Sequence, residues 1–157
     1  MNAAARTLCA LSACLLGGCG PDDGHLETYP VQGQVLVNGE PAAGCTVVFL
    51  PLDPEVSNNV RPGGLTDEEG RFELATYETG DGAPALTYGV TFRWEATDWP
   101  GRAAEEAIDP VQPVGPDRFQ GALSSPSKSG VEVTVEEGEN VLEPFRLDDV
   151  KLLPNSK

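Results

Sequence analysis

Basic residues and histidine are scarce in this chain of 157 residues. It has 10 Lys and Arg against 25 Asp and Glu, a formal net charge of -15 and a single His. Nucleic-acid binding depends on Lys and Arg that displace the counterions around phosphates, so the charge balance excludes this function class. His25 precedes the strand-like part of the chain, and we interpret it as a solvated linker residue. Mechanisms that need a rigidly held His as base or metal ligand are therefore excluded.

Aromatic residues are also few. They make up 6% of the chain, which in contrast contains 18 Gly and 14 Pro. Because Gly and Pro interrupt helices and form turns, long helices are not expected and a helical bundle is excluded. Hydrophobic residues, at 39%, still suffice for a core, and the length suits one domain. The composition favours a turn-rich, all-β fold.

The chain has no apolar run of the length that crosses a membrane, about 20 residues. Residues 7–16 form a shorter apolar run, which follows Arg6 and ends at Gly17, Gly18 and Cys19. A positive charge, a short apolar run and an exit of small residues are typical of a secretory signal peptide. The N-terminus therefore predicts export.

The segment Leu16-Gly17-Gly18-Cys19 resembles the lipobox of bacterial lipoproteins. The resemblance implies that residues 1–18 are removed as a signal peptide and that Cys19 receives acyl chains, palmitate among them. Leu11-Ser12-Ala13-Cys14 fits the same pattern but leaves a shorter apolar core before it. An ordinary signal peptide with incidental cysteines is the other alternative. We expect a protein of the cell envelope, held at the membrane by a lipid anchor and facing the periplasm or the cell surface.

Of the four cysteines, only Cys19 and Cys45 would remain after this cleavage, so we expect no disulfide framework. Cys45 begins the apolar run 45–50, and its neighbours include no His or cation that would lower the pKa of its thiol. We predict that Cys45 is a buried small hydrophobic residue.

The remaining chain divides into three parts. Residues 19–28 are polar and contain Gly and Pro, so we expect the lipidated Cys and a flexible tether. Residues 29–147 carry the strand patterns and form the single domain. Residues 148–157 are a polar tail that we expect to fray.

Alternating apolar residues predict the strands of this domain. Val31–Val37 alternates and ends at Asn38-Gly39, a pair that tolerates positive φ and predicts a hairpin turn. The β-branched and aromatic run 45–50 predicts a strand buried on both faces. We expect a single antiparallel β-sandwich of about seven strands. Further strands are expected at 71–77, 87–94, 131–135 and 140–147, with a loop at 51–65 and a turn at 79–84. The long connection at 95–130 should have one helical turn at 102–108, and we expect part of it to pack over the sandwich or to form a lid.

Several motifs resemble those of the carboxypeptidase regulatory-like domain, a small transthyretin-like (prealbumin-like) β-sandwich. They are Val31-x-Gly33-x-Val35, Asn38-Gly39-x-Pro41, Gly44-x-x-Val47-x-Phe49 and Thr66-Asp67-x-x-Gly70-x-Phe72-x-Leu74. The later stretch Tyr88-x-Val90-Thr91 is similar to the version found in small bacterial envelope lipoproteins. The resemblance implies a fold and an accessory role, and no catalytic residues.

We expect no enzymatic activity. The transthyretin-like 5-hydroxyisourate hydrolase uses His and Arg and a Tyr-Arg-Gly-Ser terminus, whereas this chain has no His after His25 and ends Leu-Pro-Asn-Ser-Lys. The sequence has no P-loop, Gly-x-Ser-x-Gly or Cys-x-x-Cys. The pairs Glu68-Glu69 and Glu105-Glu106 fit a solvated turn or helix face better than acid-base catalysis. We predict no catalytic residue, no metal ligand and no cofactor.

Two binding alternatives stay open. The turns 67–70 and 80–82 contain hard oxygens of the kind that calcium binds, although a turn-forming role of Asp67 and Asp81 explains them as well. Trp99, just before Pro100, could stack on a sugar ring, whereas Trp94 is in phase with the core face. The sequence therefore predicts a lipid-anchored envelope lipoprotein with a non-catalytic structural or protein-interaction module, or alternatively a carbohydrate- or calcium-binding accessory domain. The expected partners are the membrane, through Cys19, and an envelope protein or polysaccharide.

Overall fold

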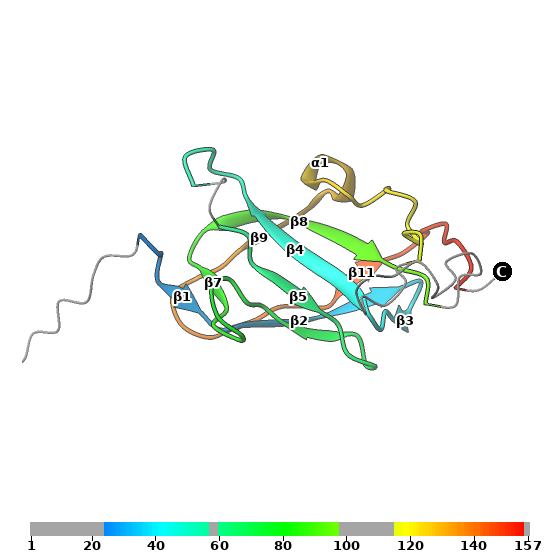
Figure 1. The fold of residues 1–157 in the computed structure, drawn as a ribbon, viewed down its shortest axis with the longest axis horizontal. Helices are drawn as coiled ribbons and strands as arrows, with labels where there is room; N and C mark the ends of the chain where they lie inside the picture. Colours follow the sequence, from blue (N-terminus) through cyan, green and yellow to red (C-terminus); the bar gives the residue numbers. More distant parts are fainter. Residues whose placement is uncertain (1–23, 57–59, 98–114, 156–157) are drawn as a thin grey trace, which may run out of the picture.

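The computed structural model describes residues 24–56, 60–97 and 115–155, and these residues are mostly β (Figure 1). The predicted all-β class is confirmed. Seven of the β segments have three residues or more, and the other four have two. In chain order the elements are β1 (Thr28–Tyr29), β2 (Val31–Val37), β3 (Glu40–Pro41), β4 (Cys45–Pro51), β5 (Gly63–Leu65), β6 (Arg71–Glu73), β7 (Ala83–Pro84), β8 (Thr87–Trp94), α1 (Pro126–Ser129), β9 (Val131–Thr134), β10 (Asn140–Val141) and β11 (Phe145–Leu147).

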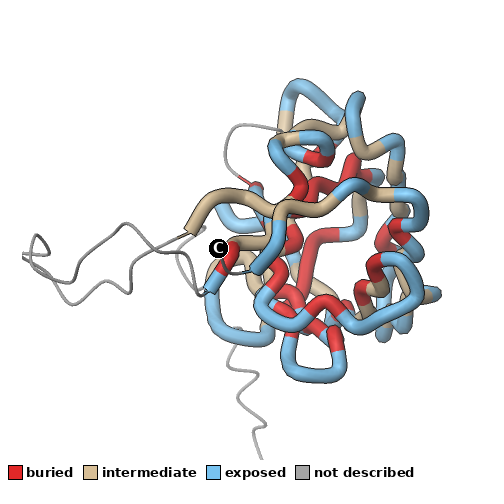
Figure 2. The backbone as a smooth tube through the Cα atoms, turned by 90° about the vertical axis from the view of Figure 1, so that its right-hand side faces the viewer, coloured by how far each residue is buried: buried red, intermediate tan, exposed pale blue. Residues whose placement is uncertain are grey.

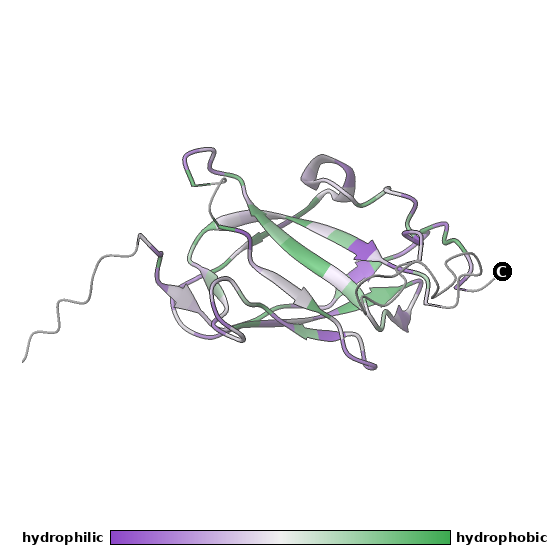
Figure 3. Cartoon of the chain, viewed as in Figure 1, coloured by the Kyte–Doolittle hydropathy of each residue, from purple (hydrophilic) through white to green (hydrophobic). Residues whose placement is uncertain are grey.

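One sheet has the strand order β5-β4-β8-β9 and is antiparallel throughout. Its long pair is β4 with β8, in register from Cys45 opposite Trp94 to Pro51 opposite Tyr88. Along β4 the hydrophobic residues (green in Figure 3) alternate between buried and half-buried positions. The prediction that this strand is buried on both faces is therefore wrong, because only one of its faces packs on the core.

The second sheet is built around β2. β3 and β6 pair with β2 antiparallel, whereas β10 and β11 pair with it parallel. The parallel pairs correct the prediction of a purely antiparallel sandwich. They arise because the chain leaves β9 at the same end of the domain at which β2 begins, crosses between the sheets through the turn 135–139, and then runs alongside β2 in the same direction (Figure 1). β1 and β7 form a separate two-stranded ladder.

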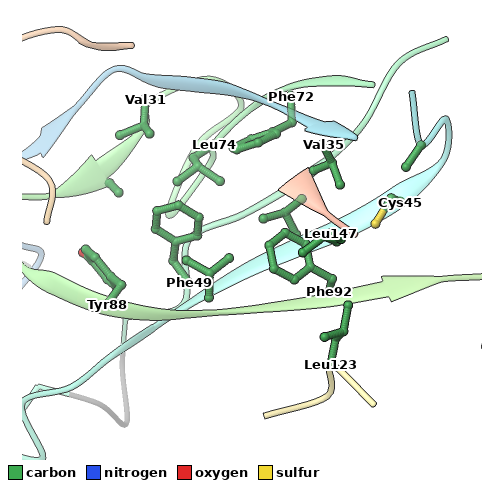
Figure 4. Packing of buried hydrophobic residues seen from close by; sticks show 14 of the residues in the cluster. Val31, Val35, Cys45, Phe49, Phe72, Leu74, Tyr88, Phe92, Leu123 and Leu147 are labelled. Carbon is green, nitrogen blue, oxygen red and sulfur yellow. The ribbon is translucent and has the colours of Figure 1, made fainter. Parts of the chain in front are cut away.

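The two sheets enclose one hydrophobic core (Figures 2 and 4). Val35 from β2 and Phe49 from β4 have no exposed surface. The Phe145 ring from β11 lies 6.5, 6.0 and 5.4 Å from the ring centroids of Phe49, Phe72 and Phe92. Fully burying one such side chain stabilises a fold by about 1.5–3 kcal/mol. These rings come from four strands of both sheets, so their contacts hold the sheets face to face.

The segment 115–130 packs along the edge of β8 beyond β9 and, at α1, over the outer face of β8. Phe92 N donates to the Leu123 carbonyl at 3.0 Å, and Arg118 N donates to the Trp94 carbonyl at 2.7 Å. Phe119 and Leu123 from this segment are buried, and Pro126 at the start of α1 sits over Gly89 so closely that a Cβ there would lie 2.4 Å from Pro126 Cβ. This packing contributes to the burial of both faces of β8 from Tyr88 to Phe92. The expectation that part of the 95–130 connection packs over the sandwich is confirmed for 115–130, while the helical turn predicted at 102–108 lies outside the described residues.

The turn at Asn38-Gly39 is confirmed, with φ of 50° and 86° and the β2–β3 pairing on either side. The loop predicted at 51–65 is wrong at its end, because Gly63–Leu65 forms β5 and pairs with β4. Gly64 allows β5 to approach β6 closely, since a Cβ on Gly64 would lie 2.5 Å from the Glu73 carbonyl oxygen.

The polar tail is attached to the domain, so the expectation that it frays is wrong for residues 148–155. Asn38 Nδ2 donates to the Val150 carbonyl at 3.1 Å, and Val150 N donates back to Asn38 Oδ1 at 3.2 Å. Leu153 N donates to the Arg118 carbonyl at 2.9 Å, and Arg118 Nε donates to the Leu153 carbonyl at 3.2 Å. Val150 and Leu152 also pack against the core.

The domain has two ends, which we call the entry end and the far end. The entry end carries residues 24–30 together with the turns at 78–82 and 135–139, and it lies on the left of Figure 1. The far end carries the Asn38-Gly39 turn, β3 and the segment 148–155, and it lies on the right.

Candidate functional site

A groove crosses the outer face of the second sheet, and we call it the β2–β6 groove. Strand alternation turns Val31 and Val35 inward and leaves Gln32 and Gln34 on the outer face. On β6 the same alternation buries Phe72 and exposes Arg71 and Glu73. The polar floor of the groove therefore follows from the period-two pattern of two neighbouring strands.

Register pairs the floor residues across the strands. Gln32 lies opposite Glu73, and Gln34 lies opposite Arg71. Side chains opposite one another in an antiparallel pair have Cβ atoms about 4.5–5.5 Å apart. The floor thus presents two carboxamides, one carboxylate and one guanidinium within reach of a single ligand.

The margins of the groove are aliphatic. Leu65 at the end of β5 is 66% exposed, and Val141 on β10 is 70% exposed. Both line the groove, whose volume is about 710 Å³. A second hollow of about 210 Å³ adjoins it toward the entry end, shares Gln32 and Glu73, and is also lined by Glu139. The two hollows therefore adjoin at Gln32 and Glu73.

The two glutamines are anchored by their amide groups. Gln34 Nε2 donates to the Glu69 carbonyl at 2.8 Å, and Gln32 Nε2 donates to Glu139 Oε1 at 3.4 Å. Within residues 24–56, 60–97 and 115–155, the side chains of Arg71 and Glu73 form no hydrogen bond or ion pair. Their charges therefore face the solvent of the groove.

Gly33 lies in β2, directly over the Phe72 ring on the core side of the groove. An added Cβ would lie 2.7 Å from Phe72 Cζ, so only glycine lets the Phe72 ring pass beneath β2. That ring is stacked on Phe145, with centroids 6.0 Å apart and planes 8° apart. The groove consequently rests on a rigid aromatic layer of the core.

The aspartates considered as calcium ligands have a structural role. Asp67 Oδ1 accepts hydrogen bonds from Glu69 N at 3.0 Å and Arg71 N at 2.8 Å. Asp81 accepts three backbone N–H groups, from residues 76–78, at 2.7 to 3.1 Å. Desolvation by itself raises the pKa of Asp81, but these hydrogen bonds outweigh it and lower that pKa. The described part of the chain contains no group of three or more His, Cys, Asp or Glu that could hold a metal ion.

Cys45 is fully buried, as predicted. Burial, assisted by the charge of Asp117, raises the pKa of its thiol to about 12, although a backbone hydrogen bond from Arg93 acts in the opposite direction. Because the thiolate is the nucleophile, such a thiol is unreactive at neutral pH.

His25 is not a purely solvated linker residue. Its ring stacks on Tyr77, with centroids 3.9 Å apart and planes 8° apart, and Leu26 N donates to the Tyr77 hydroxyl at 3.2 Å. The tether predicted for residues 19–28 therefore makes contacts with the domain at least from His25 onward.

Trp94 lies at the edge of the core and is half-buried. Its Nε1 donates to the Ala43 carbonyl at 2.7 Å, and the Arg118 guanidinium sits 3.8 Å from its ring centroid. Partial burial lowers the pKa of Arg118 from its usual value. The other predicted site residues, Cys19 and Trp99, and the pair Glu105-Glu106 lie outside the described residues.

Sequence reasoning missed the β2–β6 groove. The polar residues at alternate positions of β2 and β6 were recognisable as an outer face. The aliphatic margins were not, because Leu65 ends a segment without a strand pattern and nothing local distinguishes Val141 from its apolar neighbour Leu142. Leu142 packs against the core, whereas Val141 faces outward.

Comparison with known proteins returns no family model and no curated protein that matches the chain. Among solved structures, a 9R-lipoxygenase from Cyanothece PCC8801 is similar at 13% identity and a TM-score of 0.39. The match covers 76% of this chain but only 16% of the lipoxygenase chain. A likeness at this level carries no information about activity. Among the described residues no helix has the length and hydrophobicity to cross a membrane.

Proposed function

We propose that this protein is a lipid-anchored lipoprotein of the cell envelope, whose β-sandwich is a non-catalytic structural or protein-interaction module. The observation that carries the proposal is the short distance in sequence between the lipobox-like segment and the folded domain. Cys19 ends that segment, and β1 begins at Thr28. A signal peptide followed almost directly by a folded domain is the arrangement expected of an exported, anchored module.

The geometry of the entry end supports the same proposal. The chain joins the domain through His25, Leu26 and β1, all at the entry end. An extended chain spans at most about 3.3–3.6 Å per residue, so the six steps from Cys19 to His25 reach about 20 Å. An acylated Cys19 would hold the entry end near the membrane and leave the far end directed away from it.

Several ionisable side chains of the domain are buried or hydrogen-bonded within the fold, which supports a non-catalytic role. The Cys45 thiol is buried, and the Tyr88 hydroxyl donates to the Pro84 carbonyl at 2.8 Å within the core. Burial raises the pKa of Tyr88 as well. The carboxylates of Asp67 and Asp81 are occupied by backbone N–H groups. Within the described residues, the β2–β6 groove offers a surface for recognition.

The test is the fate of Cys19 in a bacterial host that processes lipoproteins. Mass spectrometry of the N-terminal peptide should show a chain that begins at Cys19 and carries acyl groups. In the Cys19→Ala variant both the cleavage and the acyl mass should be lost. Cys14→Ala is the matched control, since Cys14 ends the weaker lipobox-like segment, and it should be processed like the natural protein. An unacylated N-terminus in the natural protein, or acylation that survives in Cys19→Ala, would refute the proposal.

A further inference from the structure

The β2–β6 groove has the chemistry of a binding surface for one class of partner. We propose that it binds an extended polypeptide segment that carries basic residues and lies along β2. The inference rests on the proposed function as an interaction module, and it names the partner class for that module.

The shape of the depression suits an extended chain. The groove and the adjoining hollow share Gln32 and Glu73, and together they follow β2 from Gln34 back to Pro30. Strands rise about 3.3 Å per residue, so this stretch accommodates about four to five residues of an extended segment. Successive side chains of such a segment point to opposite faces, and every second one would reach the floor.

The charges in the groove favour a cation. Glu73 and Glu139 both line the hollow that adjoins Gln32. Among the described residues, the Glu73 side chain forms no hydrogen bond or ion pair. The Glu139 carboxylate accepts a hydrogen bond from the Gln32 amide and has no other polar side-chain contact there. The whole chain carries a formal charge of -15, which adds attraction for a basic partner. A lysine or arginine of the bound segment would lie between these two carboxylates.

The rest of the groove suits a peptide backbone and aliphatic side chains. The guanidinium of Arg71, which has no partner among the described residues, lies at the opposite end of the floor from Glu139, where it can donate to a carbonyl or carboxylate of the ligand. Leu65 and Val141 offer exposed aliphatic surface on the two margins. This aliphatic surface suits the side chains of a polypeptide, whereas a purely ionic ligand would not contact it.

A polysaccharide fits this surface less well. Sugar rings pack well on exposed aromatic faces, which combine a flat apolar surface with polar edges. The aromatic residue that lines the groove is Phe72, which is 3% exposed and turned toward the core. The observations therefore favour a polypeptide over a glycan.

The experiment measures binding of fluorescein-labelled Val-Lys-Val-Lys-Val to the full chain in non-ionic detergent, by fluorescence anisotropy at about 0.15 M salt, where exposed charges are screened beyond roughly 8 Å. Val-Glu-Val-Glu-Val and cellohexaose are the competing probes. We expect saturable binding of the lysine peptide and none of the glutamate peptide.

Four double variants then locate the contact. Glu73→Gln with Glu139→Gln should weaken binding about tenfold, because two carboxylates in the groove are lost. Glu55→Gln with Glu132→Gln removes the same charge elsewhere and should change affinity by less than about twofold. Leu65→Ser with Val141→Ser should also weaken binding, whereas Leu26→Ser with Leu52→Ser, which alters exposed leucines outside the groove, should not.

Equal losses in the groove and control pairs would overturn the proposal in favour of nonspecific attraction. Binding of cellohexaose that Leu65→Ser with Val141→Ser abolishes would overturn it in favour of a glycan, and absence of peptide binding to the natural chain would also refute it. The mass of the N-terminal peptide, measured on the same preparation, keeps the two proposals apart. An acylated Cys19 without peptide binding rejects the groove proposal alone.

Discussion

His25 lies flat against Tyr77, with ring centroids 3.9 Å apart and ring planes inclined by 8°. The hydroxyl of the same tyrosine accepts a hydrogen bond from Leu26 N, and β1 then pairs with β7. Three consecutive contacts therefore attach the N-terminal segment to the entry end. In a protein anchored at Cys19, these contacts would determine how the domain is oriented relative to the membrane.

Replacing Tyr77 should release this segment without unfolding the domain. Tyr77→Ala removes both the stacking on His25 and the acceptor for Leu26 N, and an aromatic pair contributes about 0.5–1.5 kcal/mol. Hydrogen exchange should accelerate for residues 26–29 and stay unchanged in β4. Tyr77→Phe keeps the ring and should give an intermediate rate. Unaltered exchange in Tyr77→Ala would show that the stack does not hold the segment.

Gly33→Ala should destabilise the protein. The new Cβ would lie 2.7 Å from Phe72 Cζ, and the ring cannot move freely because it is stacked on Phe145. Overpacking of this kind costs about 1–3 kcal/mol of unfolding free energy, measurable by urea denaturation. Gly63→Ala is the control, because its nearest contact is 3.4 Å, and it should be neutral or slightly stabilising. Equal stabilities of the two variants would contradict the predicted clash.

The Asp81 turn predicts a dependence of stability on acid pH. Hydrogen bonds from residues 76–78 lower the pKa of Asp81 in the folded state below its unfolded value, despite partial desolvation. Its contribution to stability is thus present above the unfolded pKa, about 3.9, and is lost as pH falls through the lower folded pKa. Asp81→Asn should be less stable than the natural protein at pH 7, and the difference should shrink below about pH 4. A stability difference between Asp81→Asn and the natural protein that stays constant from pH 7 to below pH 4 would contradict the prediction.

The buried Cys45 thiol predicts that the stability of the fold depends on pH in the alkaline range. Burial raises the pKa of its thiol to about 12, so the unfolded chain loses this proton first as pH rises. The contribution of the protonated thiol to stability is fully present below the unfolded pKa of about 8.5. It is lost progressively as pH rises toward the folded pKa. Cys45→Ala should be less stable than the natural protein at pH 7 and should lose less stability between about pH 8.5 and 10. Iodoacetamide should label Cys45 in urea but not in the native protein; rapid native labelling would show that the thiol is accessible.

The C-terminal segment should contribute measurably to stability. Truncation after residue 148 removes the packing of Val150 and Leu152, the paired hydrogen bonds between Asn38 and Val150, and those between Arg118 and Leu153. Such hydrogen bonds contribute about 1 kcal/mol each, so we expect a loss of several kcal/mol in urea denaturation. Truncation after Asn155 is the control and should be neutral. A neutral result for the longer truncation would mean that the segment adds no net stability.

Local patterns were enough to predict the faces of three strands. In β2, β6 and β9 the alternation of apolar and polar residues matches the observed burial, because strand side chains point to opposite faces whatever the partner strand is. The Asn38-Gly39 turn was predictable for a similar reason, since its conformation depends on two adjacent residues. Burial of Cys45 followed from the apolar character of its own strand.

Long-range contacts decided the rest. The segment Gly63–Leu65 has no strand pattern of its own and becomes β5 only because it pairs with β4. The tail at 148–155 is polar, yet its backbone finds partners in Asn38 and Arg118, which are remote in sequence. The parallel pairing of β10 and β11 likewise depends on where the chain crosses between the sheets.

The amino-acid sequence by itself determined the all-β class, the inward and outward faces of β2, β6 and β9, and the burial of Cys45, because these properties depend on neighbouring residues and on the period of a strand. The lipid anchor at Cys19 rests on local sequence as well and stays a prediction. Only the tertiary structure brought Leu65, Arg71, Gln32 and Val141 onto one surface, since β5, β6, β2 and β10 become neighbours through strand pairing and sheet packing. The groove is lined by residues from several strands, so it cannot be predicted from any single segment of the sequence.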